Sequence, residues 1–191
     1  MSDELLWMDL ETTGLVPREG RILEVACIAT DKDLNVLSTY HTLIGPPPTD
    51  VEIREWPQVV WDMHRDSGLI SELKQLVEID GGFVPGVARV EQAIIRWLNG
   101  LELVKPIVLA GSSVDFDRNW LEVHMPDLWS NLHYRVADVS STREFIRRWM
   151  PFYDEALMAV LGERAPSKHR AMPDLEDSLA LARVFQGWFR F

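Results

Sequence analysis

The sequence predicts an α/β fold in which a mixed, five-stranded sheet carries helices on both faces. Two patterns indicate this class. Three apolar segments with strand character follow one another near the N-terminus, and the rest of the chain alternates between helical periodicity and short apolar strands. At 191 residues the chain fits a single domain over residues 1–191, since one hydrophobic core usually serves about 100–200 residues.

The first three predicted strands form a meander. Glycine, proline and polar residues that favour turns separate them, and they cover Leu5–Leu10, Ile22–Ala29 and Val36–Ile44. A proline-rich segment at 45–50 then ends the pairing, because proline cannot donate a ladder hydrogen bond. The mixed pattern from 51 to 76 predicts short helices.

Helices and strands alternate in the second half of the chain. Apolar residues at 87, 90, 94, 97 and 101 have helical spacing, and Pro106 ends that helix. The elements expected next are a strand at 107–110, a helix at 115–124, a strand at 134–139, a helix that begins with a capping box at Ser141 and ends at Pro151, and a last helix from about Pro173 that buries Leu175, Leu179, Ala182 and Phe185.

The composition is acidic, with a formal net charge of −11. This charge argues against a broad basic face for long nucleic acid, but it suits carboxylates that hold divalent cations and a short anionic substrate. Asp3 and Glu4 stand where a signal peptide would carry basic residues, and no apolar run reaches the length of a membrane span. We therefore expect a cytoplasmic protein without a membrane partner, and Cys27 as a buried apolar residue.

Three groups of residues are candidates for metal binding or catalysis. Asp9 and Glu11 lie two apart in a strand and so share a face, where two carboxylates repel each other unless a cation lies between them. Asp115 and Asp117 begin a helix, where an acid can also simply favour the helix dipole. An exposed strand end with two solvated acids is the alternative for the first pair.

The third group is His169, which precedes Asp174 by five residues. A single histidine on a loop is usually an ordinary surface residue, and an acid in the first helical turn is favourable in any protein. Taken alone, this group would therefore not indicate a site.

Together, the three groups resemble the motifs of the DEDDh family of 3′→5′ exonucleases in identity, order and spacing. The segment from Asp9 to Leu15 is similar to that family's first motif, Asp117 to the second, and His169 with Asp174 to the third. The resemblance implies a ribonuclease H-like fold with two Mg²⁺ or Mn²⁺ ions held by the acids Asp9, Glu11, Asp117 and Asp174. Asp115 remains a competitor for the place of Asp117.

The chemistry of phosphodiester cleavage explains these residue types. Hard divalent cations take oxygen ligands, and two ions about 3.5–4 Å apart can stabilise both the attacking and the leaving oxygen. A histidine with an ordinary pKa of about 6.5 can accept a proton from the attacking water at neutral pH. In this interpretation His169 is the general base.

Further segments resemble the oligoribonucleases within that family. They include Arg21–Val25, the residues Trp56 and Trp61 with Ser67-Gly68-Leu69, and His133-Tyr134-Arg135. This resemblance covers nearly the whole chain. It implies a homodimer that degrades short oligoribonucleotides, dinucleotides especially, to 5′-mononucleotides.

The same resemblance implies a set of substrate contacts. Leu15 and His64 would lie against the bases, with Trp61 nearby, and Ser113 would meet the 5′ phosphate. Tyr134 and Arg135 would reach that phosphate from the other subunit. Core packing is the alternative for Trp61 and Tyr134, and a surface ion pair is the alternative for Arg135.

Two other functions compete with this interpretation. The first is a DNA 3′→5′ exonuclease of the proofreading type, because relatives of that kind share the form Thr12-Thr13-Gly14. The second is a catalytically silent scaffold of the same fold. The presence of all five catalytic residue types argues against the scaffold, whereas the choice between RNA and DNA stays open.

Overall fold

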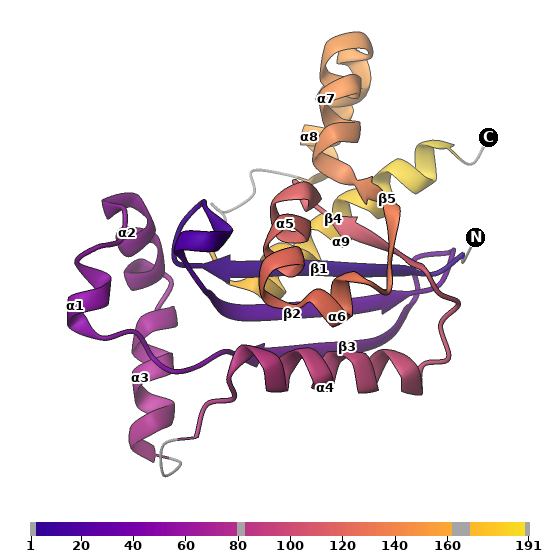
Figure 1. Ribbon diagram of the computed structural model, residues 1–191. Coiled ribbons are helices and arrows are strands. Elements are labelled where there is room, and N and C mark those ends of the chain that lie inside the picture. Colours follow the sequence, from indigo (N-terminus) through magenta and orange to yellow (C-terminus); the bar gives the residue numbers. More distant parts are fainter. Residues whose placement is uncertain (1–2, 80–82, 162–168, 190–191) are drawn as a thin grey trace.

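The computed structural model describes residues 3–79, 83–161 and 169–189. Within these residues, five strands form a mixed sheet in the order β3-β2-β1-β4-β5 (Figure 1). The strands are β1 (Leu5–Thr12), β2 (Ile22–Thr30), β3 (Val36–Leu43), β4 (Ile107–Gly111) and β5 (Leu132–Asp138). Strands β1 to β3 pair antiparallel, whereas β1, β4 and β5 pair parallel. The predicted five-stranded sheet is confirmed.

Helices cover both faces of the sheet. One hydrophobic cluster joins it to α4 (Val87–Gly100), α5 (Val114–His124) and α6 (Pro126–Trp129), and another joins it to α7 (Val139–Trp149), α8 (Pro151–Leu161) and α9 (Ala171–Phe189). Strand β1 serves both clusters because its side chains alternate between the faces. Leu6 and Met8 enter the first cluster, and Trp7 enters the second.

A smaller group of helices stands at the end of the sheet where β1 terminates (Figure 1). It consists of α1 (Asp50–Ile53), α2 (Gln58–Asp66) and α3 (Leu69–Ile79), and the single turn η1 (Pro17–Glu19) precedes β2. Leu69 and Leu73 of α3 pack against Leu23 and Leu43 of the sheet. The prediction of short helices in this segment is confirmed.

The predicted start of the helix after β5 is wrong. Asp138, and not Ser141, caps α7, because its side chain accepts the backbone N–H groups of Ser140 and Ser141 directly where the strand ends. Strand β5 also begins two residues earlier than predicted, at Leu132. Pro151 follows the end of α7, as predicted, but it also starts α8, since proline fits the first turn of a helix.

The last helix begins at Ala171, slightly before the predicted Pro173. Leu175, Leu179 and Phe185 are buried as expected, and Ala182 packs against the same cluster while partly exposed. Cys27 is fully buried in β2. Among the helices in the described parts of the chain, none combines the length and apolar character that crossing a membrane requires.

Candidate active site

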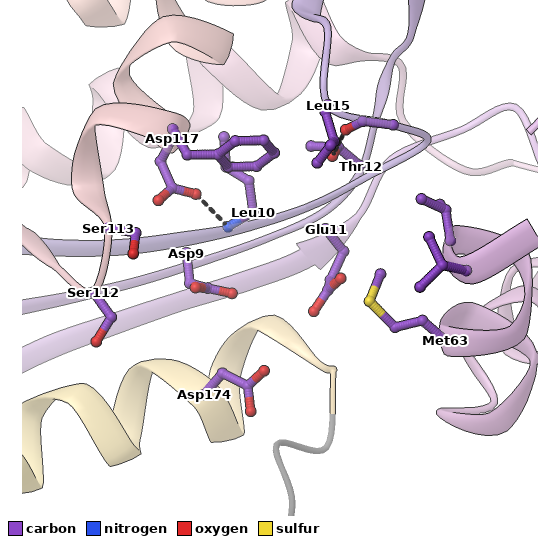
Figure 2. Close-up of a pocket in the computed structure, with 14 residues that line it drawn as sticks. Asp9, Leu10, Glu11, Thr12, Leu15, Met63, Ser112, Ser113, Asp117 and Asp174 are labelled. Atoms are coloured by element: carbon purple, nitrogen blue, oxygen red, sulfur yellow. Dashed lines mark hydrogen bonds between the residues drawn. The ribbon is translucent and has the colours of Figure 1, made fainter. Parts of the chain in front are cut away.

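Strand β1 brings Asp9 and Glu11 to one face of the sheet. The alternate residues Met8 and Leu10 are buried on the opposite face, in the cluster beneath α4 to α6. Asp174 lies in the first turn of α9, which packs on the same face as Asp9. Figure 2 shows the carboxyl groups of Asp9, Glu11 and Asp174 directed into the space between β1 and α9. Residues far apart in sequence therefore meet at one end of β1.

Asp117 approaches β1 from α5 and is 3% exposed. The parallel pairing of β1 with β4 ends at Trp7 and Ala110, so the backbone N–H of Leu10 needs another acceptor. Asp117 Oδ1 accepts this hydrogen bond at an N···O distance of 3.0 Å. Asp115 is exposed and lies outside the described residues that line the cavity. The geometry therefore favours Asp117 over Asp115.

The junction of β4 and α5 is tightly built. A Cβ atom on Gly111 would lie 2.9 Å from the carbonyl oxygen of Met8, so only glycine allows the two strands to approach this closely. Ser113 follows with a φ of 55°, and its backbone N–H donates to Ser140 Oγ at 2.8 Å and to Asp138 Oδ1 at 3.2 Å. These contacts fix the start of the helix that carries Asp117.

The four acids line one cavity of about 350 Å³. Ser112 and Ser113 also border it, so hydroxyl groups adjoin the carboxylates. The remaining wall is mostly apolar and includes Leu15, Val59, Val60, Met63 and Phe116. Val59, Val60 and Met63 of α2 were not predicted as part of the site; Val59 and Met63 lie four residues apart, as do Val60 and His64, and this helical spacing is the signal that could have indicated them.

The acids are electrostatically strained in the absence of a cation. Burial, with repulsion from Asp174 and Glu24, raises the pKa of Asp9 to about 8. Burial, with repulsion from Asp9 first among the charges, raises the pKa of Glu11 to about 9. The pKa of Asp117 is also raised well above its ordinary value, by burial and by Asp9. The raised pKa values favour the protonated forms of these carboxyl groups, and a cation between them would lower the pKa values again.

The donor set suits a divalent cation. All four side chains offer carboxylate oxygens, which Mg²⁺ and Mn²⁺ prefer over nitrogen or sulfur. In the described parts of the chain, however, no three His, Cys, Asp or Glu side chains already stand in an arrangement that could hold an ion.

His64, which was expected to lie against the bases, is fully buried in this structure. Its Nε2 donates to the carbonyl oxygen of Thr12 at 2.8 Å, because a carbonyl can only accept. Its Nδ1 lies 3.8 Å from Glu11 Oε2 and makes no hydrogen bond among the described residues. Burial lowers the pKa of His64, so the ring is neutral at pH 7. The ring thus supports the end of β1.

His169 lies two residues before the start of α9 at Ala171 and is exposed. Its φ is 48°, a left-handed conformation that is uncommon for residues other than glycine. Of His169 and Asp174, only Asp174 is among the described residues that line the cavity. His169 lies five residues before Asp174, on the backbone segment that leads into α9.

The expected substrate contacts lie at three places. Leu15 is 77% exposed at the rim of the cavity. Trp61 is half-buried against α3 and borders a different hollow, beside Trp56, which matches the core-packing alternative. Tyr134 is 67% exposed on the edge strand β5, and the guanidinium carbon of Arg135 lies 5.4 Å from the centre of its ring.

Comparison with known proteins gives relatives along nearly the whole chain. A family model described as “Exonuclease” matches residues 6–182. The oligoribonuclease of Streptomyces griseus is 36% identical over 190 residues, which covers 97% of this chain and 86% of that protein. The oligoribonuclease of Aeromonas hydrophila is 34% identical over 186 residues, covering 97% of this chain and 94% of that protein.

Solved structures share the fold at lower identity. A zinc-bound E. coli exonuclease I in complex with single-stranded DNA superposes with a TM-score of 0.67 at 20% identity, covering 99% of this chain and 41% of that chain. An exonuclease I from Methylocaldum szegediense gives 0.66 at 19% identity, covering 96% and 40%. The chain thus spans about two fifths of these solved chains, and the likeness confirms the ribonuclease H-like fold. With the family model and the oligoribonuclease relatives, it follows that the chain belongs to the exonuclease family, on its oligoribonuclease branch.

Proposed function

We propose that this chain removes nucleotides one at a time from the 3′ end of short RNA, as a two-metal-ion hydrolase. The ligands would be Asp9, Glu11, Asp117 and Asp174, and His169 would be the general base. The observation that carries the proposal is the meeting of four carboxylates from β1, α5 and α9 in one cavity. An exonuclease needs such a cluster of carboxylates to bind metal ions, whereas a catalytically silent scaffold of the same fold would not.

Two divalent cations fit this donor set on electrostatic grounds. The pKa of Asp9 is raised by burial and by repulsion from Asp174 and Glu24, and that of Glu11 by burial and by repulsion from Asp9 first among the charges. A cation between the carboxylates would offset this repulsion. When bound, such ions would stabilise the charge on the attacking and leaving oxygens and make the attacking water more acidic.

The residues of the chain would divide the remaining work. His169 would accept the proton of the attacking water, a task that suits an imidazole near neutral pH. Asp117 would keep one oxygen on the N–H of Leu10 and turn the other to the cavity. The apolar wall with Leu15 and Met63 would contact the base of the 3′ nucleotide.

A short substrate is consistent with the charge and with the relatives. The net charge of −11 leaves little cationic surface for a long phosphate backbone. The relatives from Streptomyces griseus and Aeromonas hydrophila carry the name oligoribonuclease, and the chain covers most of their length. We infer that its substrates are RNA oligomers of a few nucleotides, with the dinucleotide as the preferred one.

A homodimer would complete the substrate site. Tyr134 and Arg135 lie on an edge strand, and large exposed side chains such as Trp149 and Phe152 concentrate on the adjoining α7 and α8, which project from the β5 side of the sheet (Figure 1). Exposed apolar groups of this size mark surfaces that a partner covers. A second subunit there would bring Arg135 to the 5′ phosphate beside Ser113 of the first.

The activity is tested with end-labelled RNA and DNA of two to twenty nucleotides, incubated with Mg²⁺ or Mn²⁺ and followed in time. We expect shortening from the 3′ end with release of 5′-mononucleotides, faster on RNA than on DNA. Asp9→Asn should abolish it, and the surface change Glu122→Gln on the outside of α5 serves as the matched control. Faster cleavage of DNA would replace the proposal with a DNA exonuclease.

The contribution of the second subunit is tested by mixing two impaired variants. Asp9→Asn removes the metal site but keeps Arg135, whereas Arg135→Ala keeps the metal site but loses the cap. If Arg135 acts across the dimer, a mixed dimer restores one complete site, and an equal mixture recovers about a quarter of the wild-type sites. Absence of recovery in a mixture shown to exchange subunits would place Arg135 outside the partner's site.

A further inference from the structure

Glu24 of β2 lies beside the acidic cavity but has different partners from the acids that line it. It is 1% exposed, and its carboxylate receives hydrogen bonds from His41, from Arg170 and from the backbone N–H of Ala171. Arg170 donates from Nε at 3.1 Å to Oε2 and from Nη2 at 3.0 Å to Oε1, a two-pronged contact. The Ala171 N–H donates to Oε2 at 3.2 Å.

These contacts make Glu24 chemically different from the proposed metal ligands. It stands directly opposite Glu11 in the pairing of β1 with β2, and so shares a face of the sheet with it. Burial alone would raise the pKa of Glu24, but the hydrogen bonds from His41 and Arg170 outweigh it and the pKa is lowered. Glu24 is therefore an ionised carboxylate whose two oxygens are already occupied, and it has a structural partner where Glu11 needs a cation.

The segment that Glu24 holds is the one that carries His169. His169 has a φ of 48°, and such a conformation persists in a residue with a side chain only where the surroundings impose it. The two residues that follow are both bound to Glu24, Arg170 through its side chain and Ala171 through its backbone. Arg170 Nη2 also donates to Glu72 Oε2 at 2.6 Å, which ties the segment to α3 as well.

We propose that Glu24 and Arg170 form a positioning pair that sets the orientation of His169 relative to the acidic cavity. The inference rests on the proposed function, in which His169 is the general base. Glu24 approaches from β2 and Glu72 from α3, so the segment is fixed from two sides just before α9 begins. Neither residue of the pair is among the described residues that line the cavity, and the pair acts on the reaction through the placement of the imidazole.

The test uses Glu24→Gln and Arg170→Lys in the full chain. Gln keeps the shape of Glu but loses its charge and one acceptor, and Lys cannot reproduce the two-pronged contact. We expect kcat to fall between about ten- and a hundredfold with KM nearly unchanged, since misplacement of a catalytic group by about 1 Å has effects of this size. In Arg170→Lys, which keeps all charges near the cavity, calorimetric Mn²⁺ affinity should stay as in the wild type; Glu24→Gln removes a negative charge that repels Asp9 and Glu11, so its Mn²⁺ affinity does not bear on the pairing.

A double-mutant cycle separates positioning from general damage. In a His169→Ala background, Glu24→Gln and Arg170→Lys should cause little further loss of kcat, because the group that they position is gone. The matched control is Glu91→Gln, which alters a buried glutamate that holds the N-terminus of α6 far from the cavity. It should lower the unfolding temperature but leave kcat unchanged in both backgrounds.

Three results would overturn the pairing. They are wild-type kcat in a folded Arg170→Lys variant, losses that add fully to that of His169→Ala, or weakened Mn²⁺ binding by Arg170→Lys. Arg170→Lys decides the matter if Glu24→Gln does not fold, because the Arg170 side chain is 21% exposed and tolerates replacement better. Full activity of His169→Ala would instead remove the proposed base, a failure of the proposed function that the single variants distinguish from failure of the pair.

Discussion

Replacement of Glu11 by glutamine should make the protein more stable than the wild type without a metal ion. With a metal ion bound, the wild type should gain stability and the variant should gain far less. Burial and repulsion from Asp9 raise the pKa of Glu11 from 4.5 to about 9. The folded protein therefore holds a proton that the unfolded chain releases above pH 4.5. Since the folded state binds more protons in this window, the free energy of unfolding falls as the pH rises from about 4.5 to about 9.

The magnitude follows from the size of that window. Between pH 4.5 and pH 8 the shift corresponds to a loss of about 5 kcal/mol in unfolding free energy, as an upper limit because water entering the cavity solvates the carboxylate. Glutamine has a similar shape and does not ionise. Recovery of even about 1 kcal/mol would raise the unfolding temperature by about 2–4 °C in a protein of this size.

The assay is thermal unfolding at pH 5 and pH 8, with EDTA or with Mn²⁺. In EDTA, Glu11→Gln should be more stable than the wild type at pH 8, and the difference should shrink at pH 5, where the wild-type group is protonated at little cost. With Mn²⁺ at about a hundred times its Kd, the wild type should gain about 2.7 kcal/mol, and the variant should gain far less.

Two results would refute this reasoning. A variant less stable than the wild type at pH 8 in EDTA would mean that Glu11 has a stabilising partner in the metal-free protein. Equal stabilisation of both proteins by Mn²⁺ would remove Glu11 from the metal site. Glu91→Gln is the matched control, because Glu91 is equally buried but accepts two backbone N–H groups. It should lose stability under all four conditions.

Three further predictions concern single residues. Asp117→Asn should abolish cleavage in a Mg²⁺ assay while Asp115→Asn retains it, because Asp117 lines the cavity and Asp115 is exposed; the opposite outcome would exchange their roles. His169→Ala should lower kcat at pH 7 with little change in calorimetric Mn²⁺ affinity, and higher pH should recover part of the rate as hydroxide replaces the base; an unchanged kcat would exclude His169 from the proton transfer. Asp138→Ala should lower the unfolding free energy by about 0.5–2 kcal/mol through loss of the α7 cap, which denaturant unfolding measures. It should also weaken binding of 5′-phosphorylated dinucleotides, because the backbone of Ser113 loses a hydrogen bond to Asp138. Titration calorimetry measures this binding, and an unchanged affinity would mean that Ser113 does not contact the phosphate.

The sheet and the pair on β1 could be predicted from the sequence because both depend on local periodicity. Strand alternation alone puts Asp9 and Glu11 on one face. The choice of Asp117 over Asp115 could not be made this way, since both begin the same helix. It depends on where β1 extends past β4 and leaves the N–H of Leu10 to be satisfied by Asp117, which is a tertiary fact.

Other features stayed hidden for related reasons. The burial of His64 depends on how α2 packs against the loop after β1, and nothing in its own segment indicates a contact with Thr12, 52 residues away. The ion pair of Glu24 with Arg170 could not be predicted, because the two residues are 146 positions apart in the sequence. The start of α7 was misplaced because Asp138 at the strand end is a cap as suitable as Ser141.

The dependence of cleavage rate on RNA length is the most direct test of a substrate site that prefers dinucleotides. Single-turnover rates are measured with Mg²⁺ on 5′-phosphorylated oligomers from two to twenty nucleotides, for the wild type and for Arg135→Ala. We predict that the wild type cleaves the dinucleotide far faster than the twenty-mer, and that Arg135→Ala loses most of this preference, about ten- to a hundredfold, as expected for loss of a charge-assisted bond to phosphate. Equal wild-type rates on the two-mer and the twenty-mer would contradict the account and leave an exonuclease without preference for short RNA.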